Sequence, residues 1–258
     1  MPRGKFLDEP IHRRVTTSGF FWFTLLLCIV AFRMKLAEQV TVSSNVDGRE
    51  IPIYCVDTDH KEIGIAFDIA WGNEKTQKIV DTLKKYHVNA TFFITGGWVD
   101  QYPEDVKAIF AAGNELGNHT QNHKNMSQLS HQEKIEELQA VHSKVKELTG
   151  YEMHLFQPPY GDCDNNVINT AKECGYDTIL WSVDSLDWKN YDTDRIVNTV
   201  CENKKLKSGA IILMHNCTEN TVEALDCILS NLKDQGYEIV PISELIMNGD
   251  HPKEQSDK

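Results

Sequence analysis

The sequence has few basic residues for its size and lacks paired cysteines of the zinc-binding kind. Lys and Arg number 26 against 38 Asp and Glu, so the formal net charge is −12 over 258 residues. No basic face dominates such a composition, and we therefore expect no nucleic-acid partner. Seven cysteines are present, but none forms a Cys-x-x-Cys pair, which argues against a zinc knuckle. We expect mostly buried, unpaired thiols.

Charge is also missing from residues 15 to 32, which read VTTSGFFWFTLLLCIVAF. The run approaches the roughly 20 residues of a membrane span. A cleaved secretory signal is the alternative, but no small-x-small cleavage pattern follows, and an uncleaved anchor over 15–33 is the preferred interpretation. Basic residues are more frequent before the run than after it (Arg3, Lys5, Arg13 and Arg14 against Arg33 and Lys35). The positive-inside rule then places residues 1–14 in the cytoplasm and the following domain outside the cell membrane.

The rest of the chain is predicted to hold a linker over 34–58, one domain over 59–247 and a polar tail over 248–258. Short apolar runs alternate with helical patterns within the domain. The predicted strands are Ile63–Phe67, Ala90–Ile94, Asn114–Gly117, His154–Gln157, Thr178–Val183, Ala210–Met214 and Glu238–Pro241. The predicted helices are Lys75–Tyr86, Pro103–Ala112, a segment from a Ser130 capping box to Thr149, Asn166–Cys174, Asp194–Asn203 and Thr221–Gln235. This alternation predicts an α/β fold with parallel strands, either an open doubly wound sheet or an irregular barrel.

Reactive side chains follow most of the predicted strands directly. In chain order they are Asp68, His119 and His123, Tyr160, Asp184 and Asp187, and His215. The C-terminal ends of parallel strands converge on one face of such a fold and form its site. Contributions from five separate strands favour a barrel, whose strand ends surround one cavity. The predicted fold is therefore a distorted (β/α) barrel of about seven parallel strands, preceded by one N-terminal transmembrane helix.

The motif NHTQNH at 118–123 places His119 and His123 four residues apart, so on a helical turn they would face the same way. Imidazole is a good zinc ligand, and two imidazoles supply half of a tetrahedral site. A pair of surface or capping histidines is the alternative interpretation.

Three further stretches carry candidate residues. In QPPYG, Pro158 and Pro159 fix the backbone before Tyr160. This rigid segment either aims the Tyr160 N–H at a substrate oxygen or is only a stiff turn. In LWSVDSLDW, Asp184 and Asp187 lie between Trp181 and Trp188. In the functional interpretation, these carboxylates orient a histidine and the tryptophans form walls on which a sugar stacks. In the alternative, Trp181 is a core residue beside a solvated acidic loop. In AIILMHN, His215 follows an apolar strand. It is either a core residue with its hydrogen bonds satisfied or a general acid.

Taken together, these motifs resemble the polysaccharide deacetylases, the NodB-homology domain of carbohydrate esterase family four, and in particular the sporulation-type subgroup. The resemblance covers about residues 59–247, with five motifs in the family's order. It implies a distorted (β/α) barrel. It also implies metal-dependent removal of acetyl groups from the N-acetylated sugars of a cell-wall or chitin-like polymer. The partners it implies are that polysaccharide and, through the anchor, the membrane.

On the metal side, the resemblance implies that Asp68 is the catalytic base of a TFDDG-type motif. It implies that His119 and His123 bind a divalent metal, with zinc as the expected ion. Two positions depart from the family pattern: Ile69 stands where the second aspartate binds metal, and Gln157 stands where arginine pairs with the base. The missing ligand leaves three alternatives open, namely Asp68 itself, extra waters, or a side chain from the Asn73–Glu74 stretch.

On the acid side, the resemblance implies that Tyr160 donates a backbone N–H to the oxyanion and that His215 is the general acid. It implies that Asp187 keeps the His215 imidazole charged and oriented, and that Trp188 and Leu213 contact the substrate. The leading hypothesis is an N-deacetylase. The alternatives are a weak or inactive domain that binds glycan, or an O-acetyl esterase on the same scaffold.

Overall fold

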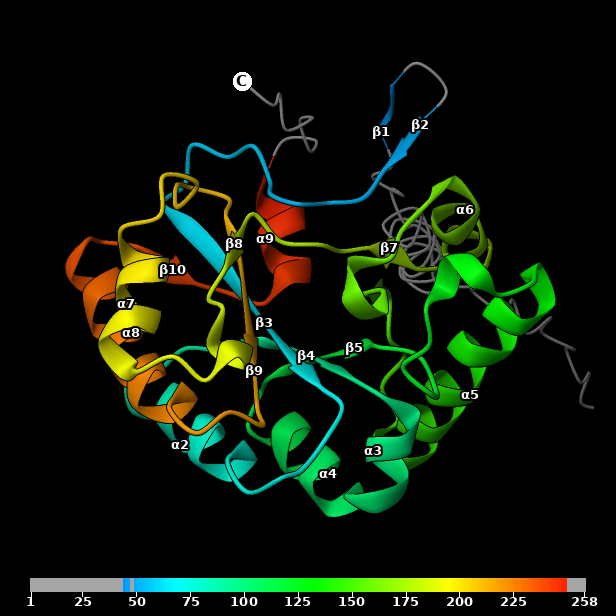
Figure 1. Cartoon of the computed structure of the whole chain (residues 1–258), viewed down its shortest axis with the longest axis horizontal. Coiled ribbons are helices and arrows are strands. Elements are labelled where there is room, and N and C mark those ends of the chain that lie inside the picture. Colours follow the sequence, from blue (N-terminus) through cyan, green and yellow to red (C-terminus); the bar gives the residue numbers. More distant parts are fainter. Residues whose placement is uncertain (1–43, 47–48, 250–258) are drawn as a thin grey trace, which may run out of the picture. The chain divides into compact units, whose positions relative to one another are not determined.

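The computed structural model describes residues 44–46 and 49–249 (Figure 1). The predicted cytoplasmic segment 1–14, the anchor 15–33 and nearly all of the polar tail lie outside these residues, and the linker is described only in part. Within the described residues, no helix combines the length and apolar character that a membrane crossing needs. The domain boundaries therefore stay predictions.

The domain is built on a sheet in which every neighbouring pair of strands is parallel. The strand order is β7-β6-β5-β4-β3-β9-β8, and β10 also pairs with the start of β3. The strands are β3 (Glu62–Ile69), β4 (Thr91–Ile94), β5 (Glu115–Asn118), β6 (Leu155–Phe156), β7 (Asp177–Thr178), β8 (Val183–Asp184), β9 (Ile211–His215) and β10 (Glu238–Ile239). The expected parallel α/β architecture is confirmed.

The sheet curls because its two edges are joined by a short piece of chain. Strands β7 and β8 lie at opposite edges, yet only residues 179–182 connect them. That connection spans about 17 Å at most, so the edges must approach each other. The single strand predicted over Thr178–Val183 is therefore wrong: the stretch ends one edge strand and begins the other. The result is a half-barrel of parallel strands, consistent with a distorted barrel.

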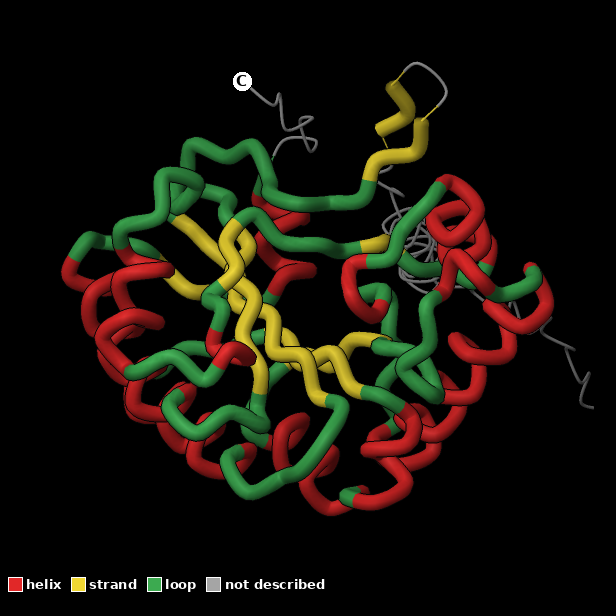
Figure 2. The backbone as a smooth tube through the Cα atoms, viewed as in Figure 1, coloured by secondary structure: helices red, strands yellow, loops and turns green. Residues whose placement is uncertain are grey.

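Helices surround the outer face of the curled sheet (Figures 1 and 2). They are α2 (Thr76–Tyr86), α3 (Gly96–Gln101), α4 (Pro103–Ala111), α5 (His131–Thr149), α6 (Asn165–Glu173), α7 (Thr193–Cys201), α8 (Thr221–Asp234) and α9 (Ile242–Asn248). The predicted capping box begins α5: the Ser130 hydroxyl accepts from the Glu133 N–H, and Glu133 accepts from the Ser130 N–H. The sequence patterns predicted neither α3 and α9 nor the small hairpin of β1 (Ser44–Val46) and β2 (Arg49–Ile51).

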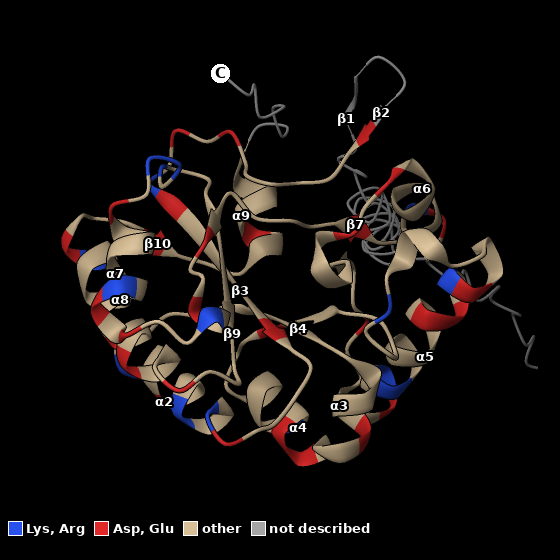
Figure 3. Ribbon diagram, viewed as in Figure 1, with Lys and Arg blue, Asp and Glu red and all other residues tan. Residues whose placement is uncertain are grey.

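The two faces of β3 pack against different groups of residues. Ile65, Phe67 and Ile69 belong to the large buried cluster that the helices complete. Ala66 belongs to a smaller cluster inside the curled sheet with Phe93. Because side chains alternate along a strand, Asp68 shares the inner face with Ala66. Acidic and basic side chains lie mainly on the helices and loops around the sheet (Figure 3), which makes the inward Asp68 an exception.

All six cysteines in the described part of the chain are unpaired. Four are half-buried (Cys55, Cys163, Cys174 and Cys201), whereas Cys217 and Cys227 are exposed. The expectation that most of these thiols are buried is therefore wrong. Burial still raises the pKa of the Cys163 thiol to about 12, which makes it a poor nucleophile at neutral pH.

Candidate active site

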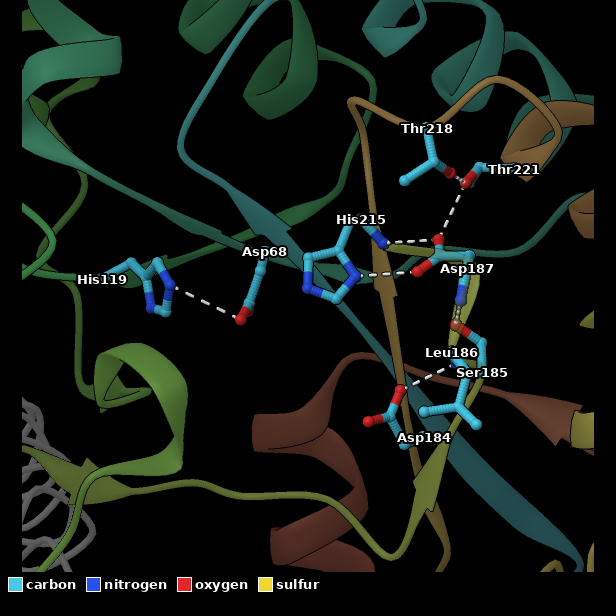
Figure 4. A network of polar contacts seen from close by, with 9 residues as sticks. All are labelled: Asp68, His119, Asp184, Ser185, Leu186, Asp187, His215, Thr218 and Thr221. Carbon is cyan, nitrogen blue, oxygen red and sulfur yellow. Dashed lines mark hydrogen bonds and ion pairs between the residues drawn. The ribbon is translucent and has the colours of Figure 1, made fainter. Parts of the chain in front are cut away.

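Asp68 lies at the centre of the site, between His119 and His215 (Figure 4). Its exposed fraction is only 9%, and its Oδ1 atom makes no hydrogen bond. Burial raises the pKa of Asp68 to about 7; the positive charge of His215 opposes this shift, while Asp187 and Asp184 add to it. A carboxyl group with this pKa exchanges a proton near neutral pH, as a general base must.

His215 ends β9 and is held by the fully buried Asp187. Its Nδ1 lies 2.8 Å from Asp187 Oδ1, and its backbone N–H donates to Asp187 Oδ2 at 2.9 Å. The Thr221 hydroxyl, which the sequence did not single out, donates to the same Oδ2 at 2.8 Å. Burial acts to lower the pKa of His215, but the hydrogen bond and charge of Asp187 outweigh it and raise that pKa. This geometry supports the predicted pairing of Asp187 with His215.

His119 follows β5 and is completely buried. Its Nδ1 lies 2.7 Å from the Gln157 carbonyl oxygen, which can only accept, so Nδ1 carries the proton. Nε2 therefore presents a lone pair, 3.5 Å from Asp68 Oδ2. Burial lowers the pKa of His119 to about 3, so this imidazole stays neutral.

His123 lies beside His119 because of a loop conformation that the sequence did not predict. Residues 119–125 form a loop instead of a helical turn, and Thr120 (φ 69°) and His123 (φ 54°) have left-handed backbones. The prediction that a helical turn makes the two histidines face the same way is therefore wrong. The two imidazole rings still meet, with centroids 4.9 Å apart. Left-handed conformations at residues other than glycine persist only where neighbours impose them.

Glu137, from the buried face of α5, is one such neighbour. It accepts hydrogen bonds from the Asn122 N–H at 2.7 Å and the Asn122 amide at 2.8 Å, and Lys124 Nζ lies 3.0 Å away. Burial acts to raise the pKa of Glu137, but these hydrogen bonds outweigh it and lower that pKa. Sequence reasoning missed Glu137, since it reads there as one more acid on an amphipathic helix.

A cavity of about 630 Å³ opens at the ends of the strands beside Asp68 and His215. Its walls include Trp71, Tyr160 and Trp188, whose exposed fractions are 59%, 66% and 51%. Leu213 and Trp181 also line it, and the half-buried Trp181 packs against the smaller cluster as well. Tyr160 has a left-handed backbone (φ 62°) in the 3₁₀ turn η2 (Pro159–Gly161). Trp71 was not among the predicted site residues, although its place three residues after Asp68 was a usable signal.

A divalent metal needs several oxygen, nitrogen or sulfur donors around one point. Three buried atoms of aspartate and histidine side chains make no hydrogen bond: Asp68 Oδ1, His119 Nε2 and His123 Nδ1. They are suitable in kind, but within the described residues no group of three or more His, Cys, Asp or Glu side chains is arranged to hold a metal ion. Gln157 is fully buried beside Asp68, and its amide favours the charged form of the Asp68 carboxyl. The donor set is therefore incomplete for the expected zinc.

Ile69 explains part of this shortfall. Its side chain is fully buried in the helix-side cluster, on the face of β3 opposite Asp68. Replacement of Ile69 with aspartate is therefore expected to bury an unpaired carboxylate and lower the free energy of unfolding by about 3–5 kcal/mol. Chemical denaturation measures this change, with Ile69→Val as the matched control at a cost of about 0.5–1.5 kcal/mol. A stable I69D protein that binds zinc tightly would show instead that the end of the strand rotates toward the site.

The comparisons identify the family. The polysaccharide deacetylase family profile matches residues 56–179. A peptidoglycan-N-acetylglucosamine deacetylase from Bacillus cereus is 42% identical over 196 residues, which cover 74% of this chain and 91% of that protein. The peptidoglycan-N-acetylmuramic acid deacetylase PdaC from Bacillus subtilis is 35% identical over 74% of this chain, but the match spans only 40% of PdaC. The chain belongs to the polysaccharide deacetylase family. The finer sporulation-type assignment stays a prediction.

Solved structures agree with this assignment and add a contrast. A CE4 family pseudoenzyme from Bacillus anthracis superposes with a TM-score of 0.74 at 38% identity, covering 77% of this chain and 69% of that one. A mutant of that pseudoenzyme with restored enzymatic activity superposes equally well. The same fold therefore occurs in a protein described as a pseudoenzyme and in its active mutant, and the fold alone does not decide activity.

Proposed function

We propose that this protein hydrolyses N-acetyl groups from an N-acetylated cell-wall polysaccharide. The observation that carries this proposal is the placement of Asp68 between a neutral His119 and the Asp187-held His215, at the edge of an aromatic cavity. A base and an acid on the two sides of one reacting centre are what amide hydrolysis requires. Family membership and the deacetylase relatives support the same reaction.

In the proposed reaction, Asp68 acts as the general base and His215 as the general acid. The Asp68 carboxylate accepts a proton from water, whose oxygen attacks the acetyl carbonyl carbon. The charged His215 imidazole then donates its Nε2 proton to the amide nitrogen as the C–N bond breaks, which releases acetate and a free amine. Asp187 keeps His215 charged and correctly oriented through the 2.8 Å contact.

The negative oxygen of the tetrahedral intermediate needs a hydrogen-bond donor. We assign this role to the Tyr160 backbone N–H, because Tyr160 lines the cavity and has a left-handed backbone conformation. Unusual backbone geometry of this kind occurs often at active sites. Donors fixed in advance around such an oxygen lower the barrier without reorganisation during the reaction.

The test is acetate release by the full chain from N-acetylglucosamine oligomers and from peptidoglycan, with bound metal measured on the same samples. We expect acetate and one free amine for each acetyl group removed. No acetate from either substrate, with or without added zinc or other divalent metals, would exclude this function. Acetate from O-acetylated sugars alone would point to the esterase alternative.

A second candidate function is glycan binding without turnover. It is favoured by the incomplete donor set and by the core position of Ile69, and the similar pseudoenzyme provides a precedent for the fold. This candidate predicts saturable binding of the same oligomers, measured by tryptophan fluorescence, without acetate release. For either function we propose a location at the outer side of the cell membrane, supported by the uncharged run at residues 15–32.

A further inference from the structure

We infer that the cavity selects a neutral N-acetylhexosamine over one that carries a carboxylate, and that Asp184 sets this choice. The inference rests on the proposed glycan site and names its substrate more closely. N-acetylglucosamine is uncharged, whereas N-acetylmuramic acid has the same acetamido group plus a lactyl carboxylate. Relatives of this chain include deacetylases named for each of these sugars.

Two carboxylates line the cavity, and they have different roles. Asp68 belongs to the proposed chemistry and is nine-tenths buried. Asp184 belongs to no step of the proposed reaction, and Figure 4 shows it apart from the Asp187–His215 contact. Its Oδ1 accepts the Leu186 N–H at 2.8 Å, and β8 pairs it with Leu213 of β9. Its charge is thus fixed in the cavity wall.

Among the described residues, no lysine or arginine side chain balances the charge of Asp184 at the wall of the cavity. No lysine or arginine is among the residues of the described chain that line the cavity. Lys189 lies nearby, with Nζ 5.0 Å from the Trp188 ring centroid, but it is not part of the lining. The positive charge of His215 is already matched by Asp187 at 2.8 Å. A carboxylate that no nearby cation balances, set among low-polarity walls, repels a ligand of the same sign.

The remaining contacts suit an uncharged sugar ring. Trp71 and Trp188 expose their rings at the cavity and offer large apolar faces to the C–H groups of a pyranose. The loop that carries Trp71 is held in place, since the Gly72 carbonyl accepts from Trp98 Nε1 at 2.7 Å and from Asn216 Nδ2 at 3.0 Å. Affinity therefore comes from uncharged surfaces, and the carboxylates determine which sugars are excluded.

The experiment compares binding of two tetrasaccharides by the full chain, followed by calorimetry at low salt. One is tetra-N-acetylchitotetraose, and the other is a peptide-free glycan of alternating N-acetylglucosamine and N-acetylmuramic acid with free lactyl carboxylates. We expect the neutral ligand to bind at least about tenfold more tightly. Asp184→Asn should reduce this ratio to about threefold or less, and high salt should reduce it in the wild type. Asp194→Asn, which removes an exposed charge on α7 outside the cavity, should leave the ratio unchanged.

The inference is overturned by equal binding of the two ligands, by tighter binding of the acidic one, by no binding of either, or by a ratio that Asp184→Asn does not change. Binding and turnover are separate measurements. A large binding ratio without acetate release would defeat the hydrolytic function and leave the selectivity intact. Acetate released mainly from N-acetylmuramic acid would defeat the selectivity and leave the hydrolytic function intact.

Discussion

Replacing Asp68 with asparagine is expected to lower the rate of acetate release by about 10²–10⁴-fold, the usual contribution of a positioned general base. Asparagine keeps the size of the side chain but cannot accept a proton from water. The measurement is initial-rate release of acetate from chitin oligomers at neutral pH. Undiminished turnover would remove Asp68 from the mechanism.

Thermal unfolding of the same variant is the control for loss of fold. Burial raises the pKa of Asp68 to about 7 from the 3.8 of a free carboxyl, so between these values the folded state holds a proton that the unfolded state has lost. The contribution of Asp68 to stability is therefore full below about pH 4 and is lost as the pH rises through about 7. A neutral asparagine is expected to remove this loss. The variant should unfold at pH 8 at a temperature no lower than the wild type, and a much lower temperature would attribute the lost activity to misfolding.

Replacing Asp187 with asparagine is expected to lower kcat by roughly 10²–10⁴-fold, as for other carboxylates that orient a catalytic histidine. Both Asp187 oxygens accept: Oδ1 from His215 Nδ1, and Oδ2 from the His215 N–H and the Thr221 hydroxyl. An amide can accept at only one of these positions, so the imidazole loses its orientation or its tautomer. Steady-state kinetics on the same oligomers measures the change.

The pH profile distinguishes this role from a purely structural one. Asp187 raises the pKa of His215, and the general acid works only while protonated. The falling limb of kcat/KM should therefore move to lower pH in D187N, because the acid loses its proton sooner. Asp194→Asn is again the matched control, since it removes one exposed carboxylate from α7. An unshifted limb in D187N would separate Asp187 from the titration of the acid.

The sequence alone identified the reactive residues and the order of the elements around them. The strand that carries Asp68, the capping box at Ser130 and the apolar strand that ends in His215 follow from local patterns of burial and hydrogen bonding, which nearby residues determine. The resemblance to the polysaccharide deacetylases depended on these same local motifs, and the family comparison confirmed it.

Other features were decided only when distant segments met. The stretch over Thr178–Val183 reads as one strand, but curling of the sheet divides it between two edges. The His119–His123 approach depends on Glu137, which is 14 residues further along the chain and has no local pattern that marks it. Ile69 occupies an expected ligand position, and alternation alone places it on the face of β3 opposite Asp68, but only the packing of distant helices and strands makes that face part of the buried core. Local patterns tell which residues share one face of a helix or strand. Which faces meet, and how closely, is set by packing between segments far apart in the chain, and no single segment encodes it.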